Sequence, residues 1–359
     1  MLILVINPGS TSTKISVYKD KNEMFTKTLR HSAGELAPFK NVVSQFDFRK
    51  KTILAALKEN DINVNDLSVV IGRGGFIKPI PSGVYKVSAA MLDDLRNARG
   101  GEHASNLGAM LADDIAKDVA KESGKEVPAL IADPIVVDEM DPVAKVTGSA
   151  EITRISVFHA LNQKAIAKRF AKEHGQKYED LNLIVAHLGG GVSVGIHKHG
   201  KVVDVNNALT GDGPFSPERS GGLPAGQLVD ICFSGKYTKE QVYKLINGKG
   251  GMVSYLGTNS FLDVSNAADG GDEKAAFIME AFIYQLSKEI GSLAPVVNGK
   301  VDAILITGGM AHNEEAMKKV EEKIKFIAPV YIYAGEDEMG ALAQNAYAVL
   351  SGDEEVKTY

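Results

Sequence analysis

The chain opens with an apolar run, residues 2–6, that stops at Asn7-Pro8-Gly9-Ser10-Thr11-Ser12-Thr13-Lys14 and resumes as Ile15-Ser16-Val17-Tyr18. The second run alternates with period two, so the pattern predicts strand, turn and strand. A Walker loop or a dinucleotide fingerprint would open a helix at this point instead. Glycine and short hydroxyl residues let backbone N–H groups approach phosphate, which makes the turn a candidate phosphate loop. The alternative is an ordinary hairpin with a polar turn.

The same plan recurs later in the chain. An apolar run at 182–186 leads into His187-Leu188-Gly189-Gly190-Gly191-Val192-Ser193, and a tight turn at 198–201 returns the chain as a further strand. A third strand, 301–307, leads into Gly308-Gly309-Met310-Ala311-His312-Asn313 and then a helical pattern. One glycine cluster alone is weak evidence, because the chain holds 36 glycines in 359 residues. The order and spacing of all three predict two related halves that close on one nucleotide.

The rest of the chain alternates between strands and helices, which predicts an α/β fold. Apolar spacing predicts helices at 35–59, 91–96 and 105–120, and short buried strands at 67–71 and 129–132. The two strands end at Gly72-Arg73-Gly74-Gly75 and at Asp133-Pro134. Polar groups at strand ends lie where open α/β sheets bind ligands.

A chain of 359 residues is long for one hydrophobic core and suits two domains. We expect a first domain over 1–145, a second over 146–339, and a C-terminal helix within 340–359 that can pack back on the first. The chain is 44% hydrophobic and 24% charged, which is typical of a globular protein.

The net charge of −5 gives no broad basic surface, which argues against nucleic acid as a partner. Cys232 is the only cysteine, so no intrachain disulfide forms, and its apolar helical surroundings predict that it packs internally. We find no secretory segment and no apolar run of about eighteen residues, the length of a membrane span. These features predict a cytoplasmic protein.

Five motifs in order resemble the acetate/butyrate kinase family, and the resemblance covers essentially the whole chain. They are the opening turn 7–14, Gly72-Arg73-Gly74-Gly75, Ser156-Val157-Phe158-His159, Ala186-His187-Leu188-Gly189-Gly190-Gly191 and Pro217-Glu218-Arg219-Ser220-Gly221. The segments 101–108, 136–140 and 204–209 are similar to the butyrate kinase branch. Acetate kinases tend to have alanine in place of Pro8 and asparagine in place of Gly190.

The resemblance implies two ribonuclease H-like domains of the actin-like ATPase superfamily, with an ATP cleft between them. It implies transfer of a phosphoryl group from ATP to a short-chain fatty acid: butanoate + ATP = butanoyl phosphate + ADP. Isobutyrate, acetate or propionate is the alternative acceptor, and a non-catalytic ATP-binding protein on this fold is the alternative class. The implied partners are a small carboxylate and ATP/ADP with Mg²⁺, and a homodimer or higher homo-oligomer is expected.

By the same resemblance, phosphate contacts are expected from Ser10, Ser12, Lys14, His187, Gly189, Gly190 and Gly191. Contacts to the adenosine and α-phosphate are expected from Gly308, Gly309 and Asn313. Asn7 and Glu338 are expected to hold Mg²⁺, directly or through water, as suits a hard cation that keeps several waters.

The catalytic residues implied are Arg73, Asp133, His159 and Arg219. The two arginines would clamp the carboxylate and the transferring phosphoryl group, a task that suits a planar guanidinium. His159 would donate to the charge that develops in the transition state, and Asp133 would orient an arginine or the carboxyl nucleophile. Because a carboxylate is ionised at neutral pH, no general base is needed.

Each assignment has a structural alternative. The arginines can be surface ion-pair partners, His159 a hydrogen-bonded structural histidine, and Asp133 a residue that ends a strand. For His187 a structural and a phosphate-side role are equally open. A shift of one residue in the match would move the metal role to a neighbour of Glu338, and position alone offers these residues for the acyl pocket: Phe76, Ile77, Pro79, Ile80 and Phe215.

Overall fold

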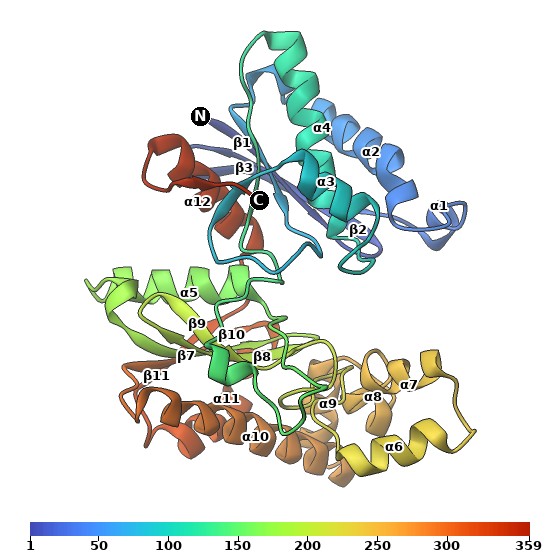
Figure 1. The fold of residues 1–359 in the computed structure, drawn as a ribbon, viewed down its shortest axis with the longest axis vertical. Coiled ribbons are helices and arrows are strands. Elements are labelled where there is room, and N and C mark those ends of the chain that lie inside the picture. The colour runs from blue at the N-terminus through green and yellow to red at the C-terminus, as the bar shows by residue number, and fades with distance from the viewer. The chain divides into compact units, whose positions relative to one another are not determined.

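The structure is a computed structural model that describes residues 1–359, and it contains two compact units. The first unit consists of Met1–Val137 together with Asp337–Tyr359, and the second of Asp138–Glu336 (Figure 1). The end of the chain therefore belongs to the unit that the beginning of the chain forms.

The first unit is built on a seven-stranded mixed sheet in the order β12-β5-β6-β4-β1-β2-β3. The predicted opening hairpin is confirmed: β1 and β2 are antiparallel, with Asn7 opposite Lys14. β4 then runs parallel to β1, and β6 parallel to β4. The strands are β1 (Leu2–Pro8), β2 (Ser12–Lys19), β3 (Asn22–Arg30), β4 (Val69–Arg73), β5 (Val84–Lys86), β6 (Ala129–Ala132) and β12 (Val356–Lys357).

Helices cover both faces of this sheet (Figure 1). Leu4 and Ile6 of β1 belong to one core cluster with Leu107 and Leu111 of α4. The residues between them point to the opposite face, because side chains alternate along a strand, and there α12 packs on β1 and β4. The helices are α1 (Ala33–Leu36), α2 (Phe46–Glu59), α3 (Ala89–Arg96), α4 (Asn106–Ser123) and α12 (Glu338–Ser351), with 3₁₀ turns at Val43–Gln45 and Val64–Asp66.

The helix predicted at 35–59 is interrupted in the structure. α1 ends at Leu36, two residues before Pro38, and α2 begins only at Phe46 after a 3₁₀ turn. Proline lacks the N–H that a helix interior needs and disfavours helical geometry in the residue before it. The apolar spacing on both sides of Pro38 therefore belongs to two separate helices.

The second unit is built on a five-stranded sheet in the order β11-β10-β7-β8-β9. β7 and β8 form the predicted second hairpin, while β10 is parallel to both β7 and β11. Read from the edge, this order repeats β3-β2-β1-β4-β6 of the first unit, with the same two antiparallel and two parallel pairings. The strands are β7 (Asn182–Leu188), β8 (Val192–Lys198), β9 (Lys201–Val205), β10 (Ala303–Gly308) and β11 (Val330–Ala334).

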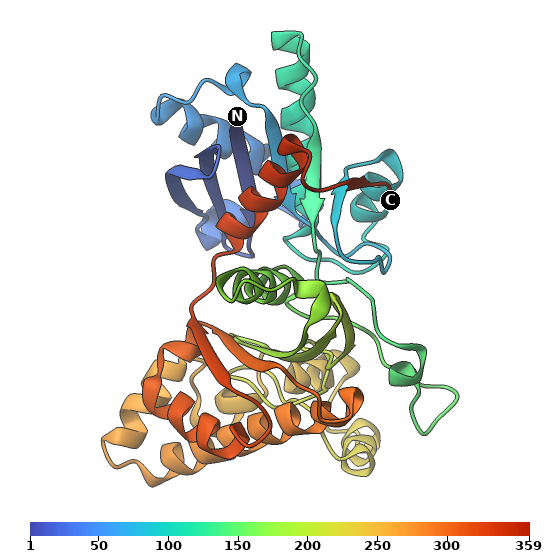
Figure 2. The ribbon, with the colours of Figure 1, turned by 90° about the vertical axis from the view of Figure 1, so that its left-hand side faces the viewer.

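One face of this sheet packs against α5 and the other against α10 and α11. The segment that precedes α5 runs outward from the sheet as an extended loop with one 3₁₀ turn, Pro142–Lys145 (Figure 2). The helices are α5 (Ala160–Glu173), α6 (Ala225–Phe233), α7 (Lys239–Ile246), α8 (Gly251–Leu256), α9 (Phe261–Asp269), α10 (Glu273–Leu293) and α11 (Glu314–Ile324), with 3₁₀ turns at Tyr178–Asp180, Ala294–Val297 and Gly309–His312.

The prediction that Cys232 packs internally is wrong, because its side chain is exposed. Cys232 lies on α6, a helix that is apolar over most of its length and yet has no buried residue. Apolar composition shows that a helix can be buried, but another element must cover it, and none in this chain does. No helix has the length and apolar character needed to span a bilayer.

Candidate active site

The candidate phosphate loop is the turn between β1 and β2. The Gly9 N–H donates to the Ser12 carbonyl over 2.8 Å and closes the turn. The hydroxyl-bearing tip, Ser10, is exposed, and so is Lys14, which follows on β2. The loop therefore presents a hydroxyl group and an ammonium group on the accessible side.

Arg49, which sequence reasoning missed, holds this loop from behind. It is fully buried on α2. Its Nη1 donates to the carbonyls of Gly9 and Ser12, each over 2.8 Å, and its Nη2 donates to the Ser10 carbonyl over 3.1 Å. A carbonyl and the N–H of the same planar trans peptide point in opposite directions, so these bonds turn the next N–H groups away from the arginine. The turn thereby acquires the polarity of an anion site.

Glu338 brings two of the predicted residues of the first unit together. Its Oε2 accepts a hydrogen bond from Asn7 Nδ2 over 2.7 Å and from Arg73 Nη1 over 2.8 Å. Arg73 therefore forms an ion pair, but the pair is partly buried and not on the surface, and the partner is itself a predicted site residue. The pair joins the end of β4 to the start of α12.

The neighbouring acids have other partners. Asp337 Oδ1 accepts from the Gly340 N–H over 2.8 Å and caps α12, while Glu336 Oε2 lies 3.5 Å from His187 Nε2. Of the three adjacent acids, only Glu338 is hydrogen-bonded to Asn7. One carboxylate and one amide oxygen form a sparse donor set, and no group of three or more acidic, histidine or cysteine side chains could hold an ion. Such a set fits Mg²⁺, which commonly binds through one or two carboxylates, substrate phosphates and water.

Asp133 ends β6 in a buried position with φ of 38°. Its Oδ1 accepts hydrogen bonds from Ser82 Oγ over 2.7 Å and from the Gly83 N–H over 2.8 Å. These bonds fasten the end of β6 to the loop before β5. They are the contacts of a residue that fixes a loop, and a catalytic role for Asp133 stays a prediction.

The second unit brings His159 and His187 together. Their rings are stacked with centroids 3.8 Å apart and an angle of 16° between planes. His159 immediately precedes α5 and its Nδ1 lies 2.8 Å from Ser193 Oγ, while His187 on β7 has its Nδ1 2.8 Å from Asn162 Oδ1. The start of a helix and the end of a strand thus position two predicted residues side by side.

Arg219 lies against the glycine turn that joins β7 to β8. A Cβ on Gly191 would overlap Arg219 Nη1, so the guanidinium occupies the space that a side chain would need. Nη1 donates to the Ala208 carbonyl over 2.8 Å, and Nε is buried without a hydrogen-bond partner. Burial lowers the pKa of Arg219, although a guanidinium stays charged in proteins. Arg219 is therefore a half-buried cation beside the glycine turn, and its role toward an anion stays a prediction.

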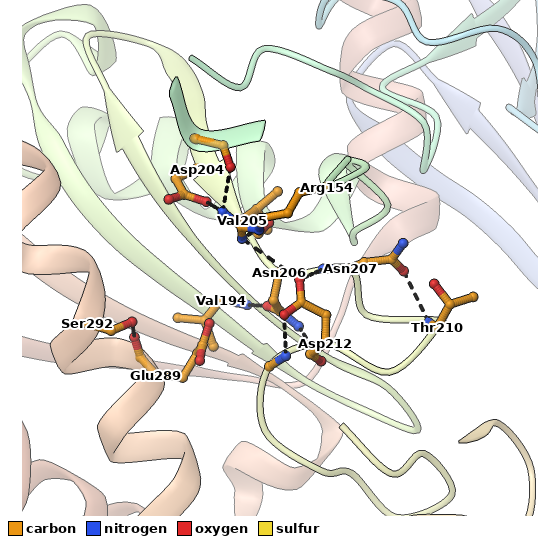
Figure 3. A network of polar contacts seen from close by, with 12 residues as sticks. Arg154, Val194, Asp204, Val205, Asn206, Asn207, Thr210, Asp212, Glu289 and Ser292 are labelled. Carbon is orange, nitrogen blue, oxygen red and sulfur yellow. Dashed lines mark hydrogen bonds and ion pairs between the residues drawn. The ribbon is translucent and has the colours of Figure 1, made fainter. Parts of the chain in front are cut away.

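Asn206 holds the loop that carries Ala208 (Figure 3). Its Oδ1 accepts from the Val194 N–H over 2.7 Å, and its Nδ2 donates to the Val192 carbonyl over 3.1 Å and to the Asp212 carbonyl over 3.3 Å. One side chain therefore ties β8 to the loop after β9. The segment 204–209, noted for its similarity to one branch of the family, thus sets the position of the carbonyl that Arg219 contacts.

Glu289 of α10 lies to the left of Asn206 in Figure 3. Burial and the nearby carboxylates of Asp212 and Asp204 raise its pKa from 4.5 to about 7, against the opposing effect of Arg154. Arg154 itself donates to Asp204 Oδ1 over 2.7 Å and to the Val205 carbonyl over 3.1 Å. One cation, Arg154, therefore lies among the carboxylates of Asp204, Asp212 and Glu289.

A cavity of about 540 Å³ lies between α9 and the turn after β10. Gly309 and Asn313 line it, and Asn313 also caps α11 and donates to Ser265 Oγ over 2.6 Å. The volume is within the range of small-molecule sites, and the N-terminus of α11 favours anions. Gly308 is the last residue of β10 and has φ of 95°, and a Cβ there would clash with the Leu188 carbonyl. Sequence reasoning missed the α9 side of the cavity: Phe261, Leu262, Ser265, Asn266 and Asp269.

The acyl-pocket candidates are largely core residues. Ile77 and Ile80 are buried in the core of the first unit. Phe215 is buried in the second, with its ring edge toward Phe282 at 5.9 Å between centroids. Their role toward an acyl chain stays a prediction.

Comparisons with known proteins place the chain in one family. The family model described as the acetokinase family matches residues 144–350. Butyrate kinase 1 and butyrate kinase 2 of Clostridium acetobutylicum are 57% and 56% identical to this chain over 99% of each sequence. Among solved structures, the acetate kinase of Porphyromonas gingivalis superimposes with a TM-score of 0.77 at 18% identity, covering 97% of this chain and 99% of its own. The acetate kinase of Entamoeba histolytica gives 0.77 at 17% identity, covering 98% and 100%. At these identities the structural matches establish the fold alone.

Proposed function

Since this chain belongs to the acetokinase family, we propose that it transfers the γ-phosphoryl group of ATP to butyrate, giving butyryl phosphate and ADP. One observation carries the choice of butyrate: more than half of the residues are identical, from end to end, with two proteins named as butyrate kinases. The site residues fit this chemistry as follows.

The acceptor needs no activation, because a carboxylate is already ionised at neutral pH. Phosphoryl transfer then depends on in-line positioning and on neutralising the charge of the transferred group. Arg219 supports this role because its guanidinium is half buried and its Nε has no partner in the protein. In the proposal Arg219 and Arg73 clamp the carboxylate and the phosphoryl oxygens, and His159 donates a hydrogen bond to the developing charge.

The nucleotide would bind with its adenosine in the 540 Å³ cavity between α9 and the turn after β10. Gly309 and Asn313 line that cavity, and the N-terminus of α11 favours the α-phosphate. The phosphate chain would then be held by the turn 189–191, by Ser10, Ser12 and Lys14, and on one side by His187.

We further propose that Asn7 and Glu338 hold Mg²⁺ together with phosphate oxygens and water. The bond between their side chains places an amide and a carboxylate within 2.7 Å of each other. Bound Mg²⁺ would neutralise charge on the β- and γ-phosphates. Glu338 would share its carboxylate between that ion and Arg73, and so align the arginine with the metal.

A homo-oligomer and a cytoplasmic location complete the proposal. Helix α6 exposes the large apolar side chains Val229, Ile231 and Phe233, which a second copy of the chain could cover. Light scattering coupled to gel filtration would show a dimer or larger assembly, and a monomer at micromolar concentration would contradict this part. The cytoplasm fits ATP as the donor and a chain with one exposed cysteine.

A hydroxamate assay of acyl phosphate, run over straight and branched acids of two to six carbons, tests the reaction. We expect the highest kcat/KM with butyrate. A maximum with isobutyrate, or with acetate or propionate, would overturn the acceptor and keep the reaction class. ATP binding without hydroxamate from any acid would overturn catalysis itself.

A further inference from the structure

A chain of buried hydrogen bonds runs from His159 into the interior of the second unit. His159 Nδ1 lies 2.8 Å from Ser193 Oγ, and Gln163 Nε2 lies 2.9 Å from the same oxygen. Gln163 Oε1 lies 3.0 Å from His197 Nε2, and His197 Nδ1 lies 2.7 Å from the Tyr178 hydroxyl. Ser193, Gln163 and His197 are fully buried, whereas His159 is partly exposed.

A backbone carbonyl fixes the orientation of the Gln163 amide. Gln163 Nε2 lies 3.0 Å from the Ser193 carbonyl, which can only accept, so the amide nitrogen and not the oxygen must be on that side. Gln163 Oε1 therefore faces His197 and needs a donor. A Cβ on residue 195 would lie 2.9 Å from that oxygen, and Gly195 leaves the room.

At the His197 end of this series of hydrogen bonds, only one arrangement of the protons is possible. Burial and the Lys164 ammonium keep the pKa of His197 well below its usual value, so the ring is neutral and carries one proton. That proton is on Nε2, because Gln163 Oε1 must receive it. His197 Nδ1 is left as an acceptor, and the Tyr178 hydroxyl donates to it.

The proton positions at the His159 end follow from the same reasoning. Ser193 Oγ accepts from Gln163 Nε2 over 2.9 Å and from the His159 backbone N–H over 3.4 Å. Both of its lone pairs are then occupied, so its own proton is donated to His159 Nδ1. A neutral His159 must then carry its proton on Nε2. The stacked ring of His187, 3.8 Å away, disfavours protonation of both rings at once, because two stacked cations would repel each other.

We propose that Ser193, Gln163, His197 and Tyr178 form a positioning relay that holds His159 as the neutral tautomer protonated at Nε2. Every bond in the relay donates toward His159, so Nε2–H is the group that the histidine offers to an anionic oxygen. The relay residues are positioning residues, since they act only through His159. The catalytic value of the relay rests on the proposed phosphoryl transfer. The tautomer of His159 does not depend on that proposal.

The tautomer is measured by long-range ¹H–¹⁵N correlation spectra of the full chain labelled with ¹⁵N-histidine. The chain has 8 histidines, and the signals lost in His159→Gln identify those of His159. We expect His159 Nε2 to be protonated and Nδ1 to be unprotonated at pH 7. A proton on Nδ1, or a mixture of both tautomers, would overturn the proposal whether or not the protein phosphorylates butyrate.

Ser193→Ala removes the donor to Nδ1, and we expect the His159 signals to become those of a tautomer mixture. We expect kcat to fall about tenfold, the ratio that 1.4 kcal/mol of barrier gives, with each KM within about twofold. Ser193→Thr, which keeps the hydroxyl, should restore both. The matched control is Ser16→Ala, since Ser16 is also a fully buried strand serine bonded to a side chain, the Thr26 hydroxyl.

An unchanged His159 spectrum in folded Ser193→Ala would overturn the relay. So would an equal loss of kcat in Ser16→Ala, because the effect would then be one of general packing. If Ser193→Ala does not fold, the wild-type spectrum and Ser193→Thr still decide, since the relay predicts one tautomer in both. If no acid is phosphorylated, the proposed function fails while the spectra continue to test the tautomer.

Discussion

Gly191→Ala should strongly lower the activity of the enzyme without removing any functional group. The backbone at Gly191 does not require glycine, since its φ lies outside the left-handed region. The new Cβ, however, would lie 1.7 Å from Arg219 Nη1 and 3.2 Å from the Ala208 carbonyl. An ordinary contact is about 3.5 Å or more, so the guanidinium must move by about 2 Å and lose its bond to that carbonyl.

The expected loss follows from this displacement. Misplacing a reacting group by about 1 Å can cost about 100-fold, and loss of a positioned arginine costs about 10³-fold or more. We expect kcat/KM of Gly191→Ala to fall between these two limits, and Arg219→Ala to reach the upper one, about 4 kcal/mol. The assay is the initial rate of butyryl hydroxamate formation, with urea unfolding to show that the fold is intact.

A double-mutant cycle makes the reasoning refutable. In Arg219→Ala the new Cβ has no guanidinium to displace, so Gly191→Ala should add little to it, and the two losses should be strongly non-additive. The control is Gly291→Ala on α10, where the nearest atom to a Cβ is 4.0 Å away and no change in rate is expected. Additive losses, or a Gly191→Ala rate within threefold of wild type, would refute the geometry.

Three other perturbations test separate parts of the structure. Arg49→Lys should lower the free energy of unfolding by about 2 kcal/mol and raise the KM for ATP, because one ammonium cannot reach the three loop carbonyls. Urea titration and steady-state kinetics measure the two effects. No change in either would show that Arg49 does not hold the loop. Glu289, with its pKa raised to about 7, binds more protons in the folded state than in the unfolded state, so stability should fall by up to about 3 kcal/mol as pH rises from 4.5 to about 7. Glu289→Gln should abolish this dependence in urea midpoints measured at pH 5 and pH 8, and an unaltered slope would contradict the cause. Glu338→Gln should raise the Mg²⁺ concentration for half-maximal rate by about tenfold or more, and Glu336→Gln should change it less. A larger effect of Glu336→Gln would assign the metal role to Glu336.

The sequence by itself determined the local plan of both units. Periodicity and turn residues placed the two glycine-bearing hairpins and the strand before the Gly308 turn, because a pleated strand repeats every two residues and glycine suits a tight turn. Motif order gave the family, which full-length identity then established. Periodicity failed at Pro38, where apolar spacing continued across a residue that no helix interior accepts. The binding of one nucleotide by both hairpins stays a prediction.

Only the tertiary structure decided which side chains meet. Asn7 and Glu338 are 331 positions apart, and nothing local distinguishes Glu338 from the two acids beside it. Arg49 has the sequence pattern of an ordinary polar helix position, yet it is buried behind the first turn. The exposure of α6 is likewise invisible in its composition. The physical reason is that turn chemistry and periodicity act over a few residues, whereas a contact or a covered face depends on which distant segment packs there.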